Sequence, residues 1–398
     1  MIKKIISISV CLLLLMTISV KAQESVNLQK AFKQAEIQYL GMLKSHPDLT
    51  KFPQSSNADG TPRDMPPKWW CSGFFPGSLW YLYEFTKDTT WGNEANKWTM
   101  ALENEQYNSS DHDLGFKLYC SFGNGYRLTK NEAYKNIMLT GAKSLASRYD
   151  PKVGLIKSWN SFQKIYNYPV IIDNMMNLEF LLWAAKASGN KTYYNICISH
   201  ADKTLKNHFR KDNSSYHVVC YDSVGNAIAK KTHQGTNDSS AWARGQTWGL
   251  YGFTVMYRET KKTEYLQKAR SIADFYLNHP NLPKDKVPYW DFNAPGIPNA
   301  PRDASAAAVA ASGLIELSTY LGKDGNKYFD AAEKMLVSLT NEPYLAKVGS
   351  NNHFILTQCV GNYPEHSEIN TPLVYADYYF LEALLRYQKI KNKRKSKI

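Results

Sequence analysis

Two aspartates stand at the starts of long apolar segments, where a charged side chain needs a physical reason. Asp173 precedes the stretch NMMNLEFLLWAA, and Asp113 precedes LGFKLYCSFG. An aspartate in this position can cap a helix by accepting hydrogen bonds from its first backbone N–H groups. Two carboxyl groups from different helices can instead share glycoside chemistry, in which one donates a proton while the other orients water or stabilises charge. An apolar pocket would raise the pKa of such an acid and so keep its proton near neutrality.

Further polar residues recur at comparable places, which favours the catalytic interpretation. His112 adjoins Asp113, and the stretch QGTNDSSAWARGQTW carries Gln234 and Arg244 at the start of another apolar segment. A buried arginine is costly without an anion. We therefore expect Arg244 either to form an ion pair with an aspartate or to bind a substrate carboxylate with its two-pronged guanidinium group.

A histidine and several aromatic residues accompany these groups. His217 lies in the loop-like sequence YHVVCYD, where a substrate contact and a merely packed histidine are equally expected. Trp70, Phe74 and Trp159 flank the same region, and Trp248 stands near the start of an apolar segment. Aromatic rings fill hydrophobic cores, and they also offer flat platforms for sugar rings. The 10 Trp and 27 Tyr of the chain are in keeping with a carbohydrate ligand.

Two kinds of helical segment alternate along the chain and would position these residues. Six are apolar on nearly every side, namely 73–86, 113–129, 173–189, 240–260, 303–322 and 371–389. Six are amphipathic, namely 24–43, 91–103, 131–149, 191–209, 262–279 and 326–340. A helix that is apolar all round must be enclosed, whereas an amphipathic helix can cover it and face water. Because the connections within each pair are short, the sequence predicts an all-α fold, a single-domain (α/α)6 barrel over residues 23–390.

The connections from an amphipathic segment to the next apolar one are much longer. They include residues 149–172, 210–240, 279–302 and 341–371, and in a barrel of antiparallel pairs all of them lie at one end. Long loops gathered at one end of a rigid scaffold usually build its functional site. We therefore expect the polar groups above to meet at that end.

The two ends of the chain carry signals of a different kind. Residues 1–22 combine a basic start, an apolar run and the cleavage pattern VKA, which predicts a signal peptide cut near Ala22 and export to a periplasm. Residues 391–398, KNKRKSKI, are expected to form a solvated basic tail. Beyond the signal peptide we expect no stable membrane insertion, since no other segment approaches the length of a membrane span.

Composition limits the partners. The net charge of +13 favours anionic ligands, but the basic residues form no clustered stripe, so we expect no nucleic acid. The five cysteines that follow the signal peptide are scattered, which predicts buried thiols with at most one disulfide. Neither a metal-ligand spacing nor a phosphate-binding loop is visible, and we expect neither metal nor cofactor.

Several motifs together resemble one known family. The chain is similar to the unsaturated glucuronyl hydrolases of glycoside hydrolase family 88 from about Trp69 to Arg386, on the motifs WWCSGFFPGSLWYLYE, DHDLGF, IIDNMMNLEFLLWA, WARGQTWGLYGF and YADYYFLEALLR. The resemblance implies an (α/α)6-barrel enzyme that acts on lyase-generated oligosaccharides, glycosaminoglycan-type fragments ending in a 4,5-unsaturated uronic acid. It further implies hydration of the C4=C5 vinyl ether, with Asp173 as general acid and base and Asp113 as a second essential carboxylate.

The resemblance also assigns the surroundings of the two acids. It implies substrate contacts at Trp70, Phe74, His112, Trp159, His217, Gln234, Arg244, Trp248 and Tyr375. Residues 361–371 correspond to a specificity loop, in which Ser367 and Thr371 are present but the lysine of enzymes for sulfated substrates is not. The polysaccharide of origin and the tolerance of sulfate therefore stay open.

Two alternatives remain at this stage. The chain could be an unsaturated rhamnogalacturonyl hydrolase acting on pectin fragments, which shares the fold and the chemistry. It could also be a catalytically silent barrel that only binds acidic glycans, although the presence of both Asp113 and Asp173 argues against this. For any of these functions we expect a monomer or a weak homo-oligomer.

Overall fold

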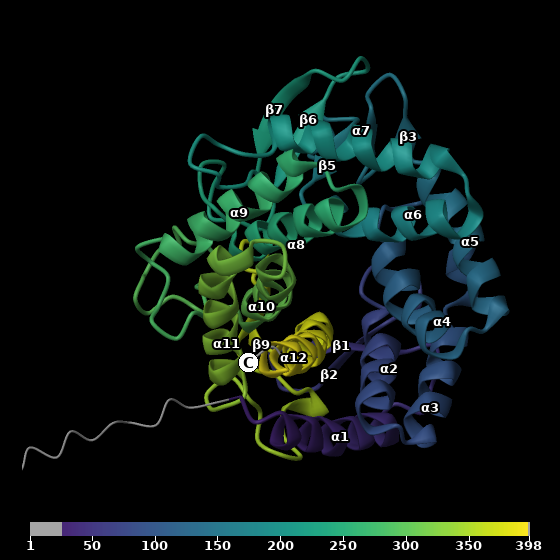
Figure 1. The fold of residues 1–398 in the computed structure, drawn as a ribbon, viewed down its shortest axis with the longest axis vertical. Helices are drawn as coiled ribbons and strands as arrows, with labels where there is room; N and C mark the ends of the chain where they lie inside the picture. The colour runs from purple at the N-terminus through teal and green to yellow at the C-terminus, as the bar shows by residue number, and fades with distance from the viewer. Residues whose placement is uncertain (1–25, 397–398) are drawn as a thin grey trace, which may run out of the picture.

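The computed structural model describes residues 26–396, and in these residues six helical segments form a closed inner ring. The segments are α2 (Phe74–Thr86), the π-helix η2 (Gly115–Gly123) continued by α4 (Asn124–Thr129), α6 (Asn174–Ser188), α8 (Ala243–Thr260), α10 (Ala304–Ser318) and α12 (Val374–Lys395). Each packs against the next, and α12 packs against α2 to close the ring (Figure 1).

Six further helices form an outer layer. They are α1 (Leu28–Ser45), α3 (Thr89–Met100), α5 (Glu132–Ala146), α7 (Lys191–Asn207), α9 (Thr263–Asn278) and α11 (Asn326–Leu339). The helices α3, α7, α9 and α11 pack on their inner partners α2, α6, α8 and α10, α5 covers η2, and α1 contacts both α2 and α12. The prediction of an all-α (α/α)6 barrel is confirmed.

The burial of the two layers follows from their sequences. Every residue of α10 except Glu316 is buried, and its run ASAAAVAASG offers small side chains that let α8 and α12 approach closely. The outer helices bury only one face, as in α11, where Tyr328, Ala332 and Met335 point inward at helical spacing. Apolar area removed from water stabilises such an arrangement by about 25 cal/mol per Å².

Four small antiparallel sheets, which were not predicted from the sequence, lie in the long connections. Three of them are two-stranded and pair β1 (Phe52–Ser56) with β2 (Pro62–Met65), β3 (Tyr149–Asp150) with β4 (Leu155–Ile156), and β8 (Cys359–Asn362) with β9 (Ser367–Thr371). In the fourth sheet the central strand β6 (Val218–Tyr221) pairs with β5 (Pro169–Ile171) on one side and with β7 (Ala227–Lys231) on the other. Three short 3₁₀ turns complete the elements, η1 (Glu103–Tyr107), η3 (Gly322–Gly325) and η4 (Asn351–His353). These strands brace loops that would otherwise carry many unpaired backbone groups.

The chain ends and the cysteines complete the description. The predicted signal peptide, residues 1–22, lies outside the described residues. The basic segment after residue 390 continues α12 as far as Lys395, and the Lys391 ammonium pairs with Glu333 at 3.1 Å. Cys71, Cys120, Cys197, Cys220 and Cys359 are all buried free thiols. Over residues 26–396 no helix is both long enough and apolar enough to span a membrane.

Candidate active site

A cavity of about 370 Å³ opens at the end of the barrel where the inner helices begin. It is enclosed by the connections that carry β1, β2, β5, β8 and β9. Eight of the residues singled out in the sequence line it together, namely Trp70, Asp113, Trp159, Asp173, Gln234, Arg244, Ser367 and Tyr375. Polar groups that are up to about 260 residues apart in sequence thus meet where the barrel geometry predicts.

The other five residues lie behind the cavity wall. Phe74, His112, His217 and Trp248 are buried without lining the cavity, and the Thr371 hydroxyl donates to the carbonyl of Ser56 at 3.2 Å. Direct contact with a substrate is therefore not shown for these residues. Their positions support the groups that do face the cavity.

Asp173 occupies the N-cap position of α6 but does not cap it. Its backbone is already helical, with φ −56° and ψ −27°, and its side chain accepts no hydrogen bond from the helix. Only 13% of the side chain is exposed, and burial raises the pKa of Asp173 to about 7, against the lowering effect of the Arg244 charge. The carboxyl group is thus placed to hold and release a proton near neutrality.

His217 is fixed beside this acid. Its Nδ1 accepts hydrogen bonds from the backbone N–H groups of His233 and Gln234, both at 3.2 Å. Burial holds the pKa of His217 well below its usual range, so the ring is neutral and its proton sits on Nε2. Nε2 lies 3.6 Å from Asp173 Oδ2, so the two atoms are close neighbours but do not form a hydrogen bond.

Asp113 is the second buried acid of the cavity. Burial raises its pKa well above the usual range, helped by the negative charge of Asp111 and, less strongly, by that of Asp173, while Lys117 opposes the shift. The fully buried Lys117 ammonium pairs with Asp111 at 3.0 Å and with Glu105 at 3.4 Å. A buried carboxyl group beside further negative charge favours its protonated form, so Asp113 holds its proton more strongly than an exposed aspartate does.

Asn177 connects the segments that carry the two acids. Its side-chain Oδ1 accepts from the backbone N–H groups of Gly115 at 2.8 Å and Phe116 at 3.3 Å. A Cβ atom on Gly115 would lie 2.5 Å from that oxygen, so only glycine permits the approach. The start of η2, and with it Asp113, is thereby fixed to α6, one turn from Asp173. The sequence offered a signal here, a polar residue four positions after Asp173 on an apolar helix, which was not recognised.

Arg244 forms the ion pair that was one of its two expected roles. Its Nη1 donates to Asp303 Oδ2 at 2.9 Å and to the carbonyl of Val360 at 2.5 Å, and its Nη2 donates to the carbonyl of Gly361 at 2.6 Å. Gln234 Nε2 donates to the same Gly361 carbonyl at 2.8 Å. Arg244 thus fixes β8 at the edge of the cavity, and its charge also acts on Asp173. A bidentate contact with a substrate carboxylate stays a prediction.

Aromatic side chains form the walls. The Trp70 ring contacts Tyr375 and Phe116, with centroids 5.0 and 5.7 Å apart, on one side of the cavity. Trp159 packs edge-on against His233 at 5.5 Å on another side. Such walls fit the faces of a sugar ring.

The mouth of the cavity contains a cluster that sequence reasoning missed. Arg63, from β2, donates to the Ser367 hydroxyl at 3.0 Å and lies 3.9 Å from Glu368, whose carboxylate accepts from Gln54 at 2.6 Å. The long connection from α1 to α2, which carries Gln54 and Arg63, is of the same kind as the four loops singled out in the sequence, and its length was the available signal.

In the described part of the chain no group of three or more His, Cys, Asp or Glu side chains could hold a metal ion.

A closed (α/α)6 barrel with two buried acids in an aromatic cavity defines a glycoside hydrolase of the barrel type. The family model for glycosyl hydrolase family 88 matches residues 47–390. An unsaturated glucuronyl hydrolase from Formosa agariphila is 45% identical to this chain, and the alignment covers 92% of both chains. An unsaturated chondroitin disaccharide hydrolase from Streptococcus agalactiae is 32% identical, and the alignment covers 93% of this chain and 92% of that enzyme. The crystal structure of an unsaturated glucuronyl hydrolase specific for heparin shares 49% identity and superposes with a TM-score of 0.89, covering 92% of this chain and 98% of that one.

The chain belongs to glycosyl hydrolase family 88, and it is a hydrolase. The resemblance inferred from the motifs is therefore confirmed. Membership of this family favours an unsaturated glucuronyl hydrolase over the two alternatives, the rhamnogalacturonyl hydrolase and the silent glycan-binding barrel.

Proposed function

We propose that the protein removes the 4,5-unsaturated uronic acid from the non-reducing end of glycosaminoglycan fragments by hydrating its C4=C5 bond. The observation that carries this mechanism is the buried Asp173, whose pKa of about 7 suits a group that first gives and then takes a proton. The names of the related enzymes support the substrate class.

The chemistry needs one acid that acts twice. In the first step the Asp173 carboxyl group gives its proton to C4, the C4=C5 pair of electrons forms the new C–H bond, and positive charge develops on C5 and the ring oxygen. In the second step the resulting carboxylate takes a proton from water while the water oxygen bonds to C5. The product is a hemiketal, which opens at the ring oxygen and then releases the remaining sugar from C1.

The surrounding groups fit these two steps. When Asp173 loses its proton, the Nε2–H group of His217 can approach and stabilise the carboxylate. The charge of Arg244 acts in the same direction. Burial raises the pKa of Asp113 well above its usual range, and in its protonated form this carboxyl group can donate a hydrogen bond to the substrate ring. No metal is required for any of these transfers.

Within this class, we propose heparin-type fragments as the preferred substrates. The related enzyme of known structure that is 49% identical is described as specific for heparin. The specificity loop lacks a lysine, but Arg63 brings a cation beside Ser367 from a different part of the chain. An arginine beside a hydroxyl group can hold a sulfate through charge-assisted hydrogen bonds.

The main test follows the double bond directly. Lyase-generated disaccharides from heparin, chondroitin and pectin are incubated with the mature protein, and the ultraviolet absorbance of the conjugated C4=C5 bond is recorded. We expect absorbance to fall with the glycosaminoglycan products, at a rate lowered about 100-fold or more in Asp173→Asn. Asp330→Asn, on the exposed face of α11, is the control and keeps full activity. A fall with the pectin product alone would contradict the proposal.

A second test addresses the sulfate. Arg63→Ala is expected to lower kcat/KM for a sulfated heparin disaccharide about ten-fold, while the unsulfated counterpart changes about three-fold or less. Lys68→Ala, an exposed change in the same connection, serves as the control. Equal losses for the two substrates would assign Arg63 a structural role only.

A further inference from the structure

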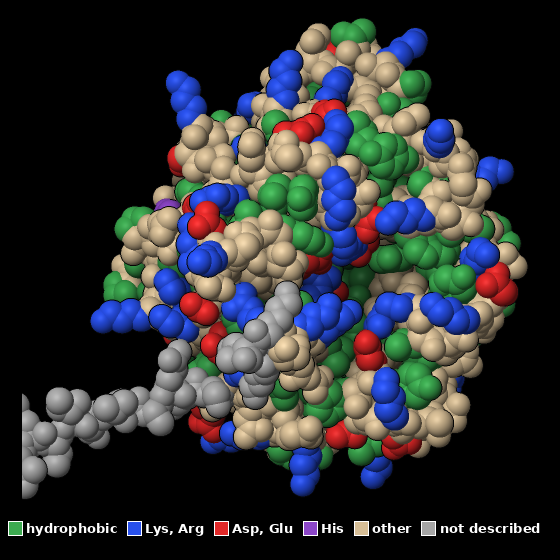
Figure 2. Space-filling model, in the orientation of Figure 1, with side chains coloured by type: hydrophobic (Ala, Val, Ile, Leu, Met, Phe, Trp, Pro, Cys, Tyr) green, Lys and Arg blue, Asp and Glu red, His purple; other side chains and the backbone are tan. Residues whose placement is uncertain are grey.

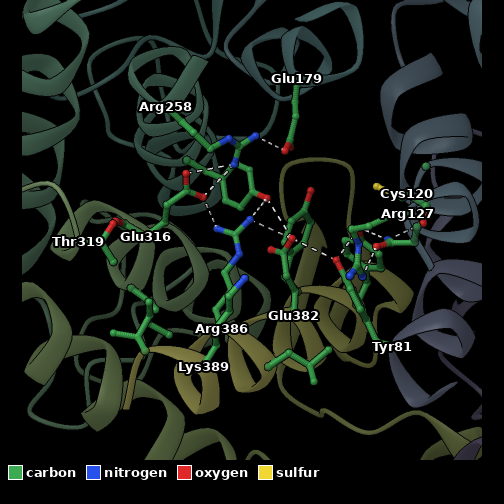
Figure 3. Close-up of a pocket in the computed structure, with 18 of the residues that line it drawn as sticks. Tyr81, Cys120, Arg127, Glu179, Arg258, Glu316, Thr319, Glu382, Arg386 and Lys389 are labelled. Atoms are coloured by element: carbon green, nitrogen blue, oxygen red, sulfur yellow. Dashed lines mark hydrogen bonds and ion pairs between the residues drawn. The ribbon is translucent and has the colours of Figure 1, made fainter. Parts of the chain in front are cut away.

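A second and larger cavity lies at the opposite end of the barrel, where the inner helices finish. It measures about 1020 Å³ and is lined by side chains near the ends of all six inner segments, among them Glu84, Arg127, Trp183, Arg258 and Glu316. Figure 3 shows Arg127 and Arg258 extending into it from α4 and α8. The proposed reaction uses none of these residues.

An aromatic layer separates this far-end cavity from the candidate active site. The layer consists of four rings, Phe74, Phe116, Trp248 and Tyr379, each in contact with the next, and the last contacts the first. The distances between neighbouring ring centroids are, in this order, 5.2, 5.4, 5.5 and 5.8 Å. Phe116 and Tyr379 face the far-end cavity. A ligand there would therefore occupy a site of its own.

The floor of the far-end cavity is a network of planar polar groups. Arg258 Nη1 contacts both carboxylate oxygens of Glu316 at 3.1 Å and its Nη2 pairs with Glu179, while Arg386 pairs with Glu316 at 2.8 Å and Glu382 at 3.2 Å (Figure 3). Charges matched in this way leave lone pairs and N–H groups that suit sugar hydroxyl groups. They leave no unpaired acid to donate a proton, so the floor suits binding and not cleavage.

The rim has a different character, because it is strongly basic. Lys130, Lys389, Lys393 and Arg394 line the cavity, and within residues 26–396 none of them has a carboxylate within 4.0 Å. Lys389 and Lys393 are exposed and lie one helical turn apart on α12, a spacing at which like charges repel each other. Figure 2 shows Lys and Arg side chains around a hollow near the centre of this face. An anionic ligand would remove the repulsion.

One wall is aromatic. Trp183 on α6 packs against Tyr126 with centroids 5.9 Å apart and against Tyr119 at 6.3 Å, and all three rings are only partly buried. Lys130 lies over Tyr126, 5.6 Å from the ring centre. A flat apolar wall beside a row of cations matches a ligand that has a ring face and negative substituents.

We propose that the far-end cavity is a second saccharide site, which binds an acidic oligosaccharide without cleaving it. The carboxylate or sulfate groups of the ligand lie against the basic rim, its hydroxyl groups contact the arginine–glutamate floor, and a sugar face lies on Trp183. The cavity exceeds the size needed for a disaccharide-sized ligand. Such a site would hold the enzyme on an acidic polysaccharide or its fragments. The proposal rests on the cavity itself and does not depend on the reaction proposed for the active site.

The test is isothermal titration calorimetry of the full mature chain. The probe is a heparin-derived tetrasaccharide made by chemical depolymerisation, so that it has no C4=C5 bond. We expect the Lys389→Glu/Lys393→Glu double variant to bind it at least about ten-fold more weakly than the wild type. Lys33→Glu, an exposed change of the same kind on α1, keeps the wild-type affinity. Turnover of an unsaturated disaccharide stays unchanged in the double variant, because both lysines lie away from the active site.

Three outcomes would overturn the proposal. The first is equal affinity in the wild type and the double variant. The second is loss of binding in Arg63→Ala but not in the double variant, which would locate the probe in the active site. The third is equally tight binding of inorganic sulfate, which would indicate a simple anion site. If instead no disaccharide is turned over but the tetrasaccharide result holds, the proposed reaction fails and the second site stands.

Discussion

Replacing Asp173 with Asn is expected to stabilise the folded protein at neutral and alkaline pH while it removes turnover. In the unfolded chain this carboxyl group ionises near its ordinary pKa of 3.8, whereas in the folded protein burial raises the pKa to about 7. Between these values the folded state binds the additional proton, so folding is progressively disfavoured as the pH rises through this window. An amide in the same place has no proton to lose and avoids the cost.

The magnitude follows from the size of the pKa shift. Each pKa unit corresponds to about 1.4 kcal/mol, so the rise from 3.8 to about 7 makes Asp173 cost about 4 kcal/mol once the pH exceeds 7. The side chain is only 13% exposed, so solvent screening reduces this value little. At pH 5 the cost is less than half of this value, and below pH 3.8 it vanishes. The proposed catalytic acid is thus maintained at the expense of stability.

Urea denaturation of the wild type and Asp173→Asn at pH 5, 6, 7 and 8 measures this difference. We expect the free energy of unfolding of the variant to exceed that of the wild type by an amount that grows with pH and levels off above pH 7. Asp330→Asn, exposed on α11, should show no such trend. A difference between wild type and Asp173→Asn that is independent of pH, or a variant less stable at pH 8, would refute the reasoning.

Three further predictions follow from the site and the chain ends. The kcat/KM for an unsaturated disaccharide should fall as the pH rises through about 7, because Asp173 must be protonated to act. A pH–rate profile measures this dependence, and a kcat/KM that increases through this range would contradict the prediction. Asn177→Ala should lower kcat about ten-fold or more with an unchanged circular dichroism spectrum, because it frees the start of η2; an unchanged kcat would exclude this role. For export, we propose that the mature chain begins at Gln23, which N-terminal sequencing of the secreted protein tests; a chain that retains residues 1–22 would contradict the signal peptide.

The periodic part of the fold could be predicted from the sequence because its pattern is local. Apolar and amphipathic segments alternate, and each inner helix begins after a long loop, so Asp113 and Asp173 could be located at one end of the barrel. The ion pair of Arg244 was likewise among its expected roles, since a buried guanidinium group needs an anion.

The rest depends on contacts between distant segments. Nothing in the sequence near His217 says that the strand directly after it, β6, pairs with β5 just before Asp173, and that pairing is what brings the ring to the acid. Arg63 joins Ser367 across about 300 residues, so a search for a lysine within the loop itself could not find the cation. Whether an aromatic ring faces the cavity, as Trp70 does, or lies behind it, as Trp248 does, is likewise decided by packing and not by spacing.

The central claim is that Asp173 protonates C4 before the sugar is released, and proton NMR of the reaction in deuterium oxide tests it most directly. The proposed mechanism predicts that the product released at early times has lost the double bond and carries one deuterium at C4 in a single configuration, since the deuteron comes from one fixed carboxyl group. Release of an unsaturated uronic acid that still carries the C4=C5 bond and no deuterium at C4 would show cleavage at the anomeric carbon and contradict the mechanism.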